Sequence, residues 1–269
     1  VLADVIKSRL FSVNELTHIY RQSEDSYIVT NAHLINSGKM PVIEKDSKDF
    51  FFIARDNQED ILNEVTGLVT TRLPKFTSLS PAEIQVLAPM KSGLAGVANL
   101  NRTLQAKINP FERSKSEINV GGVVFRTGDK VMQTKNNYDI PWKKNGADGF
   151  GIFNGDIGVI RSIDMISQVL HIDFDGRMAE YDFMMTEELE LAYAITVHKS
   201  QGSEYPIVIF PLYRYTPKLL TRNLFYTAVT RAQQMVILVG DGEVANRMIE
   251  NNRQTKRYTG LGYWLTQYD

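Results

Sequence analysis

Short apolar runs alternate with helix-like segments along much of this 269-residue chain. Strand-like runs are expected at residues 15–20, 50–54, 84–88, 189–196, 207–212 and 235–240. Helical patterns lie between several of them, at about 26–37, 58–73, 94–109 and 219–230. Apolar strands that are followed by helices of about ten or more residues are typical of a parallel sheet covered on both faces. We therefore expect a doubly wound α/β core.

The alternation breaks between about residues 111 and 188, where short strands are separated by turn pairs. Asn154-Gly155 follows an apolar pair and precedes Ile157, which indicates a hairpin because both central residues of such a turn have positive φ. Gly121-Gly122 and Asp175-Gly176 are further turn pairs, and partial alternation over 171–183 indicates a second hairpin. The polar stretch 136–151 is expected to be a mobile loop. We expect a small antiparallel barrel inserted into the α/β domain.

Composition narrows the class of protein. The chain has no cysteine, so we expect neither a disulfide framework nor a thiolate metal site, and we predict no metal ligands. No apolar run approaches the ~20 residues of a membrane span, and the N-terminus has no signal-peptide pattern. A cytoplasmic protein without a membrane partner is expected. The net charge of -1 is unlike that of a basic nucleic-acid-binding domain, so any nucleic-acid contact has to come from a local groove.

Two polar motifs in the last third of the chain carry candidate chemistry. Residues 196–204 read Thr-Val-His-Lys-Ser-Gln-Gly-Ser-Glu after an apolar strand, and residues 226–231 read Tyr-Thr-Ala-Val-Thr-Arg. The polar side chains of the first motif could contact nucleic-acid phosphates, and Gly202 permits close backbone approach. Glu204 could accept a hydrogen bond from a ribose hydroxyl. Two of these residues have an alternative without a ligand contact: His198 could be a structural histidine, and Lys199 could be a solvated surface charge.

Two arginines are candidates for contact with a nucleotide. A guanidinium stabilises charge on a transferred phosphoryl group through a planar, always charged fork. Arg231 follows a helical run, where an arginine can also simply cap helix carbonyls. Arg21, with Gln22 beside it, ends a strand-like run, and strand ends are where doubly wound sheets bind ligands. A surface salt bridge is the alternative for Arg21.

Several strings together resemble the C-terminal half of RecD-like DNA helicases, the RecD/TraA group of superfamily one, which moves 5′ to 3′. The resemblance covers nearly the whole chain. Its strings are 16–38, 85–93 with the downstream pairs 100–101, 104–105 and 109–110, then 128–139, 153–158, 196–204 and 226–231. No stretch reads G-x-x-x-x-G-K-[ST], the phosphate-cradling loop that a motor needs. In the family that loop precedes a helix resembling residues 1–10.

The resemblance implies a RecA-like second motor domain of the P-loop NTPase type, formed by residues 16–110 and 189–269. Residues 111–188 would form the inserted barrel, of Src-homology-three type, and residues 1–15 the tail of a first motor domain and a linker. It implies ATP and Mg²⁺ in the intact protein, neither held tightly by this chain alone. The chain alone is expected neither to turn over ATP nor to unwind DNA. Implied partners are single-stranded DNA, the first motor domain and recombination nuclease subunits.

The resemblance also implies roles for single residues. Arg21 and Arg231 would face the γ-phosphate of ATP, and the implied nucleotide contacts are Gln22, Gly202 and Glu204. The implied DNA contacts are Pro89, Lys91, Ser92, Asn101, Lys135, Asn136, Asn137, Thr196 and His198. Tyr138 and Trp142 could stack on bases, with packing at the barrel rim as the alternative for Trp142. Turn geometry explains Asn154 and Asp156 better than ligand contacts do.

Two classes of function stay open from the sequence. The first is a motor segment of an ATP-dependent helicase, and the second is a non-catalytic nucleic-acid-binding or docking module with the same fold. The presence of Arg21, Gln22, Glu204 and Arg231 favours the first class, because a binding module has no use for residues that face a γ-phosphate. An unrelated nucleotide-binding α/β enzyme is disfavoured because the chain has no glycine-rich phosphate loop.

Overall fold

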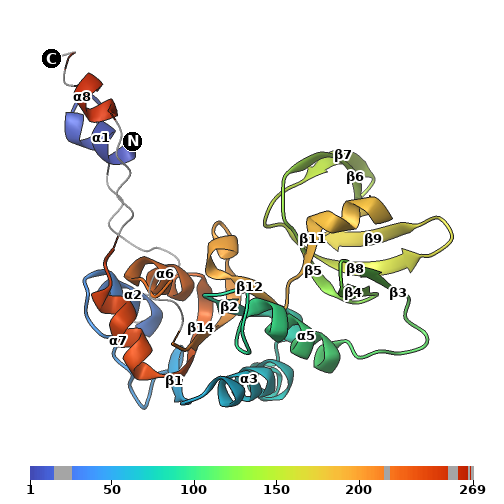
Figure 1. Cartoon of the computed structure of the whole chain (residues 1–269), viewed down its shortest axis with the longest axis horizontal. Helices are drawn as coiled ribbons and strands as arrows, with labels where there is room; N and C mark the ends of the chain where they lie inside the picture. Colours follow the sequence, from blue (N-terminus) through green and yellow to red (C-terminus); the bar gives the residue numbers. More distant parts are fainter. Residues whose placement is uncertain (15–25, 215–218, 254–259, 266, 268–269) are drawn as a thin grey trace.

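A computed structural model describes residues 1–14, 26–214, 219–253, 260–265 and 267 of the chain (Figure 1). Among these residues, five parallel strands form one sheet in the order β1-β14-β13-β2-β12. The strands are β1 (Phe50–Ala54), β2 (Ile84–Ala88), β12 (Ala194–Thr196), β13 (Tyr205–Leu212) and β14 (Ala232–Gly240). The expected parallel α/β sheet is confirmed, and β1 and β2 have the predicted bounds.

Helices cover both faces of the parallel sheet (Figure 1). They are α2 (Tyr27–Asn36), α3 (Gln58–Gly67), α5 (Val97–Ile108), α6 (Arg222–Val229) and α7 (Gly242–Glu250). Neighbouring residues of β13 belong to different cores: Ile207 and Ile209 pack with α3 and α5, whereas Val208 and Phe210 pack with α2, α6 and α7. This two-sided burial explains why the strands are apolar runs instead of alternating ones.

The helix expected at 58–73 is longer and less regular than predicted. After α3, the π-helical segment η1 (Leu68–Arg72) leads into α4 (Leu73–Thr77), where Pro74 stands in the first turn. A proline in a helix interior removes a hydrogen bond and clashes with the preceding turn, so a wider turn accommodates it. The 3₁₀ turn η2 (Pro81–Glu83) then leads into β2. The strand expected at 15–20 lies outside the described residues.

The second sheet is antiparallel. Among the described strands its order is β11-β5-β8-β9-β10-β6-β7, and β3 (Glu117–Val120) and β4 (Val123–Arg126) form a separate hairpin. Its strands are β5 (Lys130–Gln133), β6 (Asn137–Lys144), β7 (Ala147–Ile152), β8 (Ile157–Asp164), β9 (Val169–Phe174), β10 (Arg177–Asp182) and β11 (Leu189–Leu191). The 3₁₀ segment η3 (Phe183–Glu188) precedes β11. The expected small antiparallel β domain is confirmed.

Two loop predictions in this region are wrong. The stretch expected to be a mobile loop contains the hairpin β6–β7, whose turn residues Asn145 and Gly146 have φ of 51° and 82°. Asn154-Gly155 does not close a hairpin, since β7 and β8 are not neighbours in the described sheet. Gly155 has φ of 97°, but Asn154 is not in the positive range. The hairpin turns expected at Gly121-Gly122 and Asp175-Gly176 are confirmed.

The single strand expected at 189–196 is two strands in different sheets. Leu189–Leu191 pairs antiparallel with β5, and Ala194–Thr196 pairs parallel with β2. The change of sheet is fixed by Asn101 of α5, whose amide donates to the carbonyls of Leu191 (2.8 Å) and Ala194 (2.9 Å). The Ala194 amide donates back to Asn101 Oδ1 (2.7 Å).

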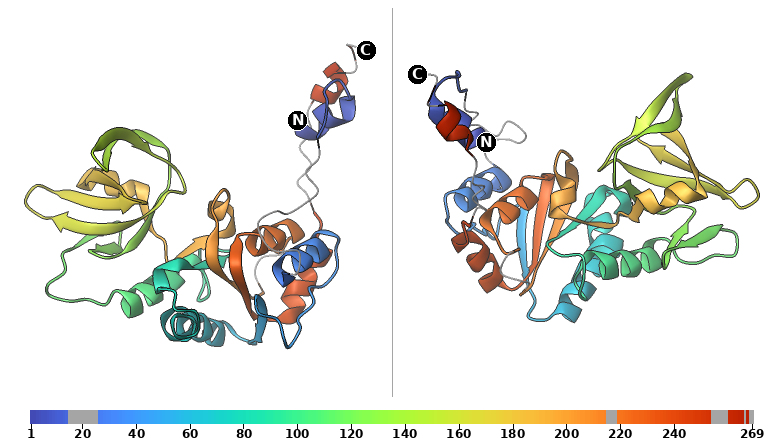
Figure 2. Two further views of the ribbon diagram at one scale, coloured as in Figure 1. Left: turned by 180° about the vertical axis from the view of Figure 1, so that it is seen from behind. Right: turned by 45° about the horizontal axis from the view of Figure 1, so that its top comes forward.

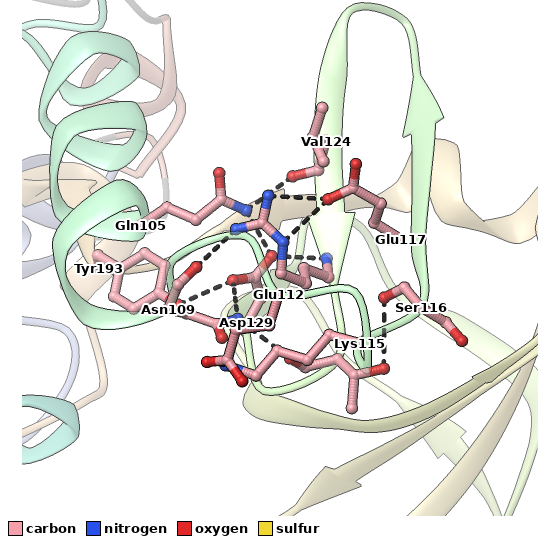
Figure 3. Close-up of polar contacts among 11 residues, drawn as sticks. Gln105, Asn109, Glu112, Lys115, Ser116, Glu117, Val124, Asp129 and Tyr193 are labelled. Atoms are coloured by element: carbon pink, nitrogen blue, oxygen red, sulfur yellow. Dashed lines mark hydrogen bonds and ion pairs between the residues drawn. The ribbon is translucent and has the colours of Figure 1, made fainter.

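A buried carboxylate joins the two sheets close to this crossing (Figure 3). Asp129 is fully buried and accepts hydrogen bonds from the side chains of Gln105 (2.5 Å) and Asn109 (2.7 Å) on or next to α5. It also accepts from the Arg126 backbone amide (2.7 Å) and the Tyr193 hydroxyl (2.9 Å). Asp129 therefore joins α5, β4 and the connection that enters β12.

The described parts of the two termini lie together, away from both sheets (Figures 1 and 2). Helix α1 (Leu2–Ser8) packs beside α8 (Leu261–Leu265), and a Cβ at Gly262 would lie 3.5 Å from Asp4 Oδ1. Within the part of the chain that the structure describes, no helix has the length and apolarity needed to cross a membrane. The described residues also contain no group of three or more His, Cys, Asp or Glu side chains placed to hold a metal ion.

Candidate functional site

The two edges of the parallel sheet separate the two sets of candidate residues. All strands of a parallel sheet begin at one edge and end at the other. Thr196 ends β12 opposite Ala88 of β2, so Lys91 and His198 follow strands at the carboxyl edge. Tyr205 begins β13 opposite Ala232 of β14, so Glu204 and Arg231 precede strands at the amino edge. The candidate DNA contacts of the α/β part that follow a strand thus lie at the edge opposite Glu204 and Arg231.

Residues 196–204 run from one edge of the sheet to the other. After Thr196 the chain forms the 3₁₀ turn η4 (Val197–Ser200), whose Ser200 is buried with its hydroxyl donating to the Val197 carbonyl (2.7 Å). Gly202 follows with φ of 89°, a backbone conformation that favours glycine. This short connection physically links the edge that carries His198 to the edge that carries Glu204.

Arg231 lies beside the end of that connection. The Arg231 guanidinium donates from Nη1 to the Ser203 carbonyl (3.1 Å), and the Arg231 backbone carbonyl accepts from the Tyr205 amide (2.9 Å). Glu204 is exposed and accepts from the side chain of Gln233 (3.2 Å). The structure therefore brings Arg231, Gly202 and Glu204 together. Arg21 and Gln22 lie outside the described residues.

At the carboxyl edge, the candidates differ in exposure. Lys91, Ser92 and His198 are exposed, Thr196 is half-buried, and Pro89 is buried. An exposed ammonium, hydroxyl and imidazole are suited to phosphate oxygens of a passing strand. Pro89 shapes the turn after β2 and offers little surface.

Asn101 does not belong to this surface, which corrects the sequence-based expectation. Its side chain is 6% exposed, and its amide is engaged on both sides by the backbone at the β11–β12 crossing. A nucleic-acid strand could reach that amide only if the crossing opened. Asn101 holds β12 in position, and it thereby positions Thr196, which ends the strand, and His198, which lies two residues further on.

The barrel adds a second group of candidates at its rim. Asn136 accepts from the Asn154 amide (3.0 Å), which fixes the chain around residue 136 against the Asn154-Gly155 turn. A Cβ at Gly155 would lie 3.9 Å from the Lys199 carbonyl, so this turn sits against η4. Asn137 and Lys135 both contact Glu188, at 3.1 Å and 3.3 Å. The barrel rim and the carboxyl edge are therefore adjacent.

The two aromatic candidates differ. Tyr138 is 67% exposed and makes an edge-to-face contact with the partly exposed Phe153, with ring centroids 5.5 Å apart. Trp142 instead covers Gly149 on the neighbouring strand, where an added Cβ would lie 2.3 Å from the indole ring. Trp142 also packs against the barrel core. Packing is the better description of Trp142, and Tyr138 keeps a free face for stacking.

Sequence reasoning missed two carboxylates between these groups. Glu188 and Glu190 alternate with the buried Leu189 and Leu191, and their side chains are 14% and 41% exposed. Glu188 pairs with Lys135, whereas Glu190 pairs with both Lys91 (3.4 Å) and Lys199 (2.7 Å). Burial raises the pKa of Glu190, but the hydrogen bond from Lys199 and the charges of both lysines outweigh it, so the pKa lies below the usual range. The Glu-Leu-Glu-Leu alternation indicates a strand, but it does not indicate which lysines the glutamates contact.

Comparison with known proteins shows which helicases the chain is similar to. The model of the ATP-dependent RecD-like DNA helicase SH3 domain matches residues 100–174, and that of the UvrD-like helicase C-terminal domain matches residues 191–239. The chain is 33% identical over 226 residues to the ATP-dependent RecD2 DNA helicase of Deinococcus radiodurans, covering 84% of this chain. By these matches the chain is similar to the RecD-like helicases. It is also 33% identical over 180 residues to the RecBCD enzyme subunit RecD of Mycolicibacterium smegmatis, covering 66% of this chain.

The RecD-like chain spans 28% of the length of each of these two relatives. The crystal structure of a Bacteroides Pif1 helicase in complex with ADP-AlF3 and single-stranded DNA shows the same fold, with a TM-score of 0.53 at 17% identity. That similarity covers 96% of the RecD-like chain and 57% of the Pif1 chain. The RecA-like α/β fold expected from the sequence is thereby confirmed.

Proposed function

We propose that this RecD-like chain is the second motor domain of an ATP-dependent 5′→3′ DNA helicase. Single-stranded DNA lies along the carboxyl edge of its parallel sheet and the adjacent barrel rim, and ATP faces the amino edge. The observation that carries the proposal is the course of residues 196–204, which connect Thr196 at one edge to Glu204 beside Arg231 at the other. The names of the relatives, RecD2 DNA helicase and RecD subunit, support the choice of DNA.

At the amino edge, Arg231 acts on ATP that a first motor domain holds together with Mg²⁺, and Arg21 is proposed to act on the same ATP. Arg231 supplies a guanidinium to the γ-phosphate, where charge develops during transfer. Gln22, Gly202 and Glu204 contact the nucleotide, with the Glu204 carboxylate accepting from a ribose hydroxyl. This chain alone holds neither ATP nor Mg²⁺ tightly in this proposal, and it does not turn over ATP.

At the carboxyl edge, the side chains of Lys91, Ser92, Thr196 and His198 hold the phosphates of the strand. Lys135, Asn136 and Asn137 line its path along the barrel rim, and Tyr138 offers a face to a base. In a two-domain motor, closure around nucleotide alternates with opening, and each domain grips the strand in turn. The connection 196–204 couples nucleotide binding at the amino edge to DNA binding at the carboxyl edge, because both of its ends are fixed in the sheet.

The domain limits belong to the same proposal. Residues 16–110 and 189–269 form the motor domain, residues 111–188 the barrel, and residues 1–15 the tail of the first motor domain with a linker. The crossing of β11 into the antiparallel sheet extends the barrel's pairing to Leu191. A cytoplasmic location and assembly with recombination nuclease subunits complete the proposal, the latter supported by the RecBCD relative.

A paired titration of the 269-residue chain with single-stranded DNA and ATP tests this function. We expect weak binding that falls steeply with salt, and no ATP hydrolysis. Lys91→Ala is expected to weaken binding and to flatten the slope of log K against log salt by at most about 0.7, the full value for one phosphate contact on a single strand. Lys48→Ala, an exposed lysine before β1 at the amino edge, removes the same charge and should leave the slope unchanged.

Two results would contradict the proposal. Hydrolysis by this chain, once contaminating enzymes are excluded, would require a phosphate site of its own. Equal effects of Lys91→Ala and Lys48→Ala would remove Lys91 from the DNA track. Salt-sensitive binding by a longer protein that showed no response to nucleotide would instead favour a non-catalytic binding module.

A further inference from the structure

Two of the lysines at the proposed DNA surface are held by one carboxylate. Glu190 Oε1 lies 3.4 Å from the Lys91 ammonium and Glu190 Oε2 lies 2.7 Å from the Lys199 ammonium. The three residues come from β11, the turn after β2 and η4, so the fold gathers them from distant parts of the chain. Both ammoniums therefore have a negative partner at the place where the proposed function puts phosphates.

We propose that Glu190 is an internal competitor of DNA: its carboxylate occupies Lys91 and the neighbouring Lys199 in the free chain, and phosphates of the strand displace it from both lysines. This inference rests on the proposed function and adds a residue that tunes affinity. Glu190 is not a DNA contact. It sets how tightly Lys91 and Lys199 hold a strand and how readily they release it.

The exposure of the three side chains makes such an exchange feasible. The side chain of Lys91 is 66% exposed, that of Glu190 41% and that of Lys199 21%. Ion pairs with this much exposure are weak, because water and salt screen the attraction and both side chains lose freedom. A carboxylate released by the lysines would be solvated at once. A motor that steps along DNA needs contacts which break easily, and a nearby carboxylate supplies the alternative partner.

The competition has a signature in salt dependence. When a lysine moves from Glu190 to a phosphate, the strand releases counterions but the freed carboxylate attracts cations again. The net release is then smaller than for a lysine without an internal partner. Removing the carboxylate charge is expected to strengthen binding and to steepen the slope of log K against log salt, by up to about 0.7 for each lysine.

The test is single-stranded DNA binding by the 269-residue chain, measured by fluorescence anisotropy from low to high salt. Glu190→Gln keeps the shape of the side chain and removes its charge. We expect it to bind roughly threefold to tenfold more tightly at low salt, with the gain fading as screening increases. Glu187→Gln is the matched control, since Glu187 is an exposed glutamate in η3 and its replacement changes the net charge equally.

A second background separates competition from a general charge effect. In a chain that carries Lys91→Ala and Lys199→Ala, Glu190→Gln is expected to give no gain beyond that of Glu187→Gln. The inference is overturned if Glu190→Gln equals Glu187→Gln in the wild-type background, or if it weakens binding. If the wild-type chain shows no salt-sensitive DNA binding, both the proposed function and this inference are overturned. If the wild-type chain binds as expected and Glu190→Gln binds DNA with the same affinity, the inference alone is overturned.

Discussion

Replacing Arg231 with alanine in a full-length RecD-like helicase that carries this sequence is expected to lower ATP turnover by about a thousandfold or more. An arginine that stabilises charge on the transferred phosphoryl group is worth about 10³–10⁵ in rate. Single-stranded DNA binding should be largely retained, because Arg231 lies at the amino edge of the sheet and the proposed DNA contacts of the motor domain lie at the carboxyl edge. Steady-state ATP turnover at saturating DNA and DNA affinity without nucleotide measure the two effects.

Two further variants sharpen the Arg231 experiment. Arg231→Lys keeps the charge but loses the planar fork, so it should recover only a small part of the turnover. Arg161→Ala removes an exposed barrel arginine that pairs with Asp173, and it should leave turnover near the wild-type value. Turnover by Arg231→Ala within tenfold of the wild type would show that Arg231 does not act on the γ-phosphate.

Replacing Asp129 with alanine is expected to lower the free energy of unfolding by about 3–5 kcal/mol. The substitution leaves the side-chain donors of Gln105, Asn109 and Tyr193 buried without their shared acceptor, together with one backbone amide. Each buried polar group that loses its acceptor costs about 1–3 kcal/mol, so the loss of these four hydrogen bonds accounts for a change of this size. Urea unfolding followed by fluorescence and circular dichroism would measure the loss.

Asp148→Ala is the control for the Asp129 variant. Asp148 is an exposed aspartate of β7, and its loss should change the free energy of unfolding by less than about 0.5 kcal/mol. Asp129→Asn keeps an acceptor but places amide protons against the donors, so it should lie between wild type and Asp129→Ala. Equal stability of the Asp129→Ala and Asp148→Ala variants would mean that the network in Figure 3 contributes little to joining the sheets.

The parallel sheet could be predicted because its strands are buried on both faces. Such strands have to be apolar throughout, and the runs 50–54 and 84–88 show this directly. Because the run 189–196 is also mostly apolar, the sequence does not show that it contains two strands in different sheets. Leu191, Ala194 and their neighbours are apolar in either sheet, and the separation depends on hydrogen bonds to Asn101, which lies about 90 residues earlier in the chain.

The barrel was harder to predict because turn chemistry does not fix sheet order. Asn154-Gly155 suits a hairpin, but β8 pairs with β5 and β9 and leaves β7 to pair with β6. The β6–β7 hairpin resembles a loop in the sequence because its strands are largely polar and exposed. Its Asn145-Gly146 turn was a usable signal, since both residues have positive φ.

The candidate site divides in the same way. Two motifs, 196–204 and 226–231, are distinctive as whole strings. The sequence alone could therefore select their members Thr196, His198, Glu204 and Arg231. Glu190 could not, because one glutamate on an alternating strand looks like an ordinary solvated residue. Its meaning depends on Lys91, 99 residues away in the sequence, which only the fold brings to 3.4 Å.

Hydrogen–deuterium exchange of the 269-residue chain, with and without single-stranded DNA at low salt, tests the separation of the two edges most directly. We expect DNA to slow exchange in residues 89–93 and 196–201 at the carboxyl edge and in 134–138 at the barrel rim. Residues 203–204 and 231–233 at the amino edge should exchange at unchanged rates. Protection of the amino edge by DNA, with no protection of residues 89–93 and 196–201, would contradict the account.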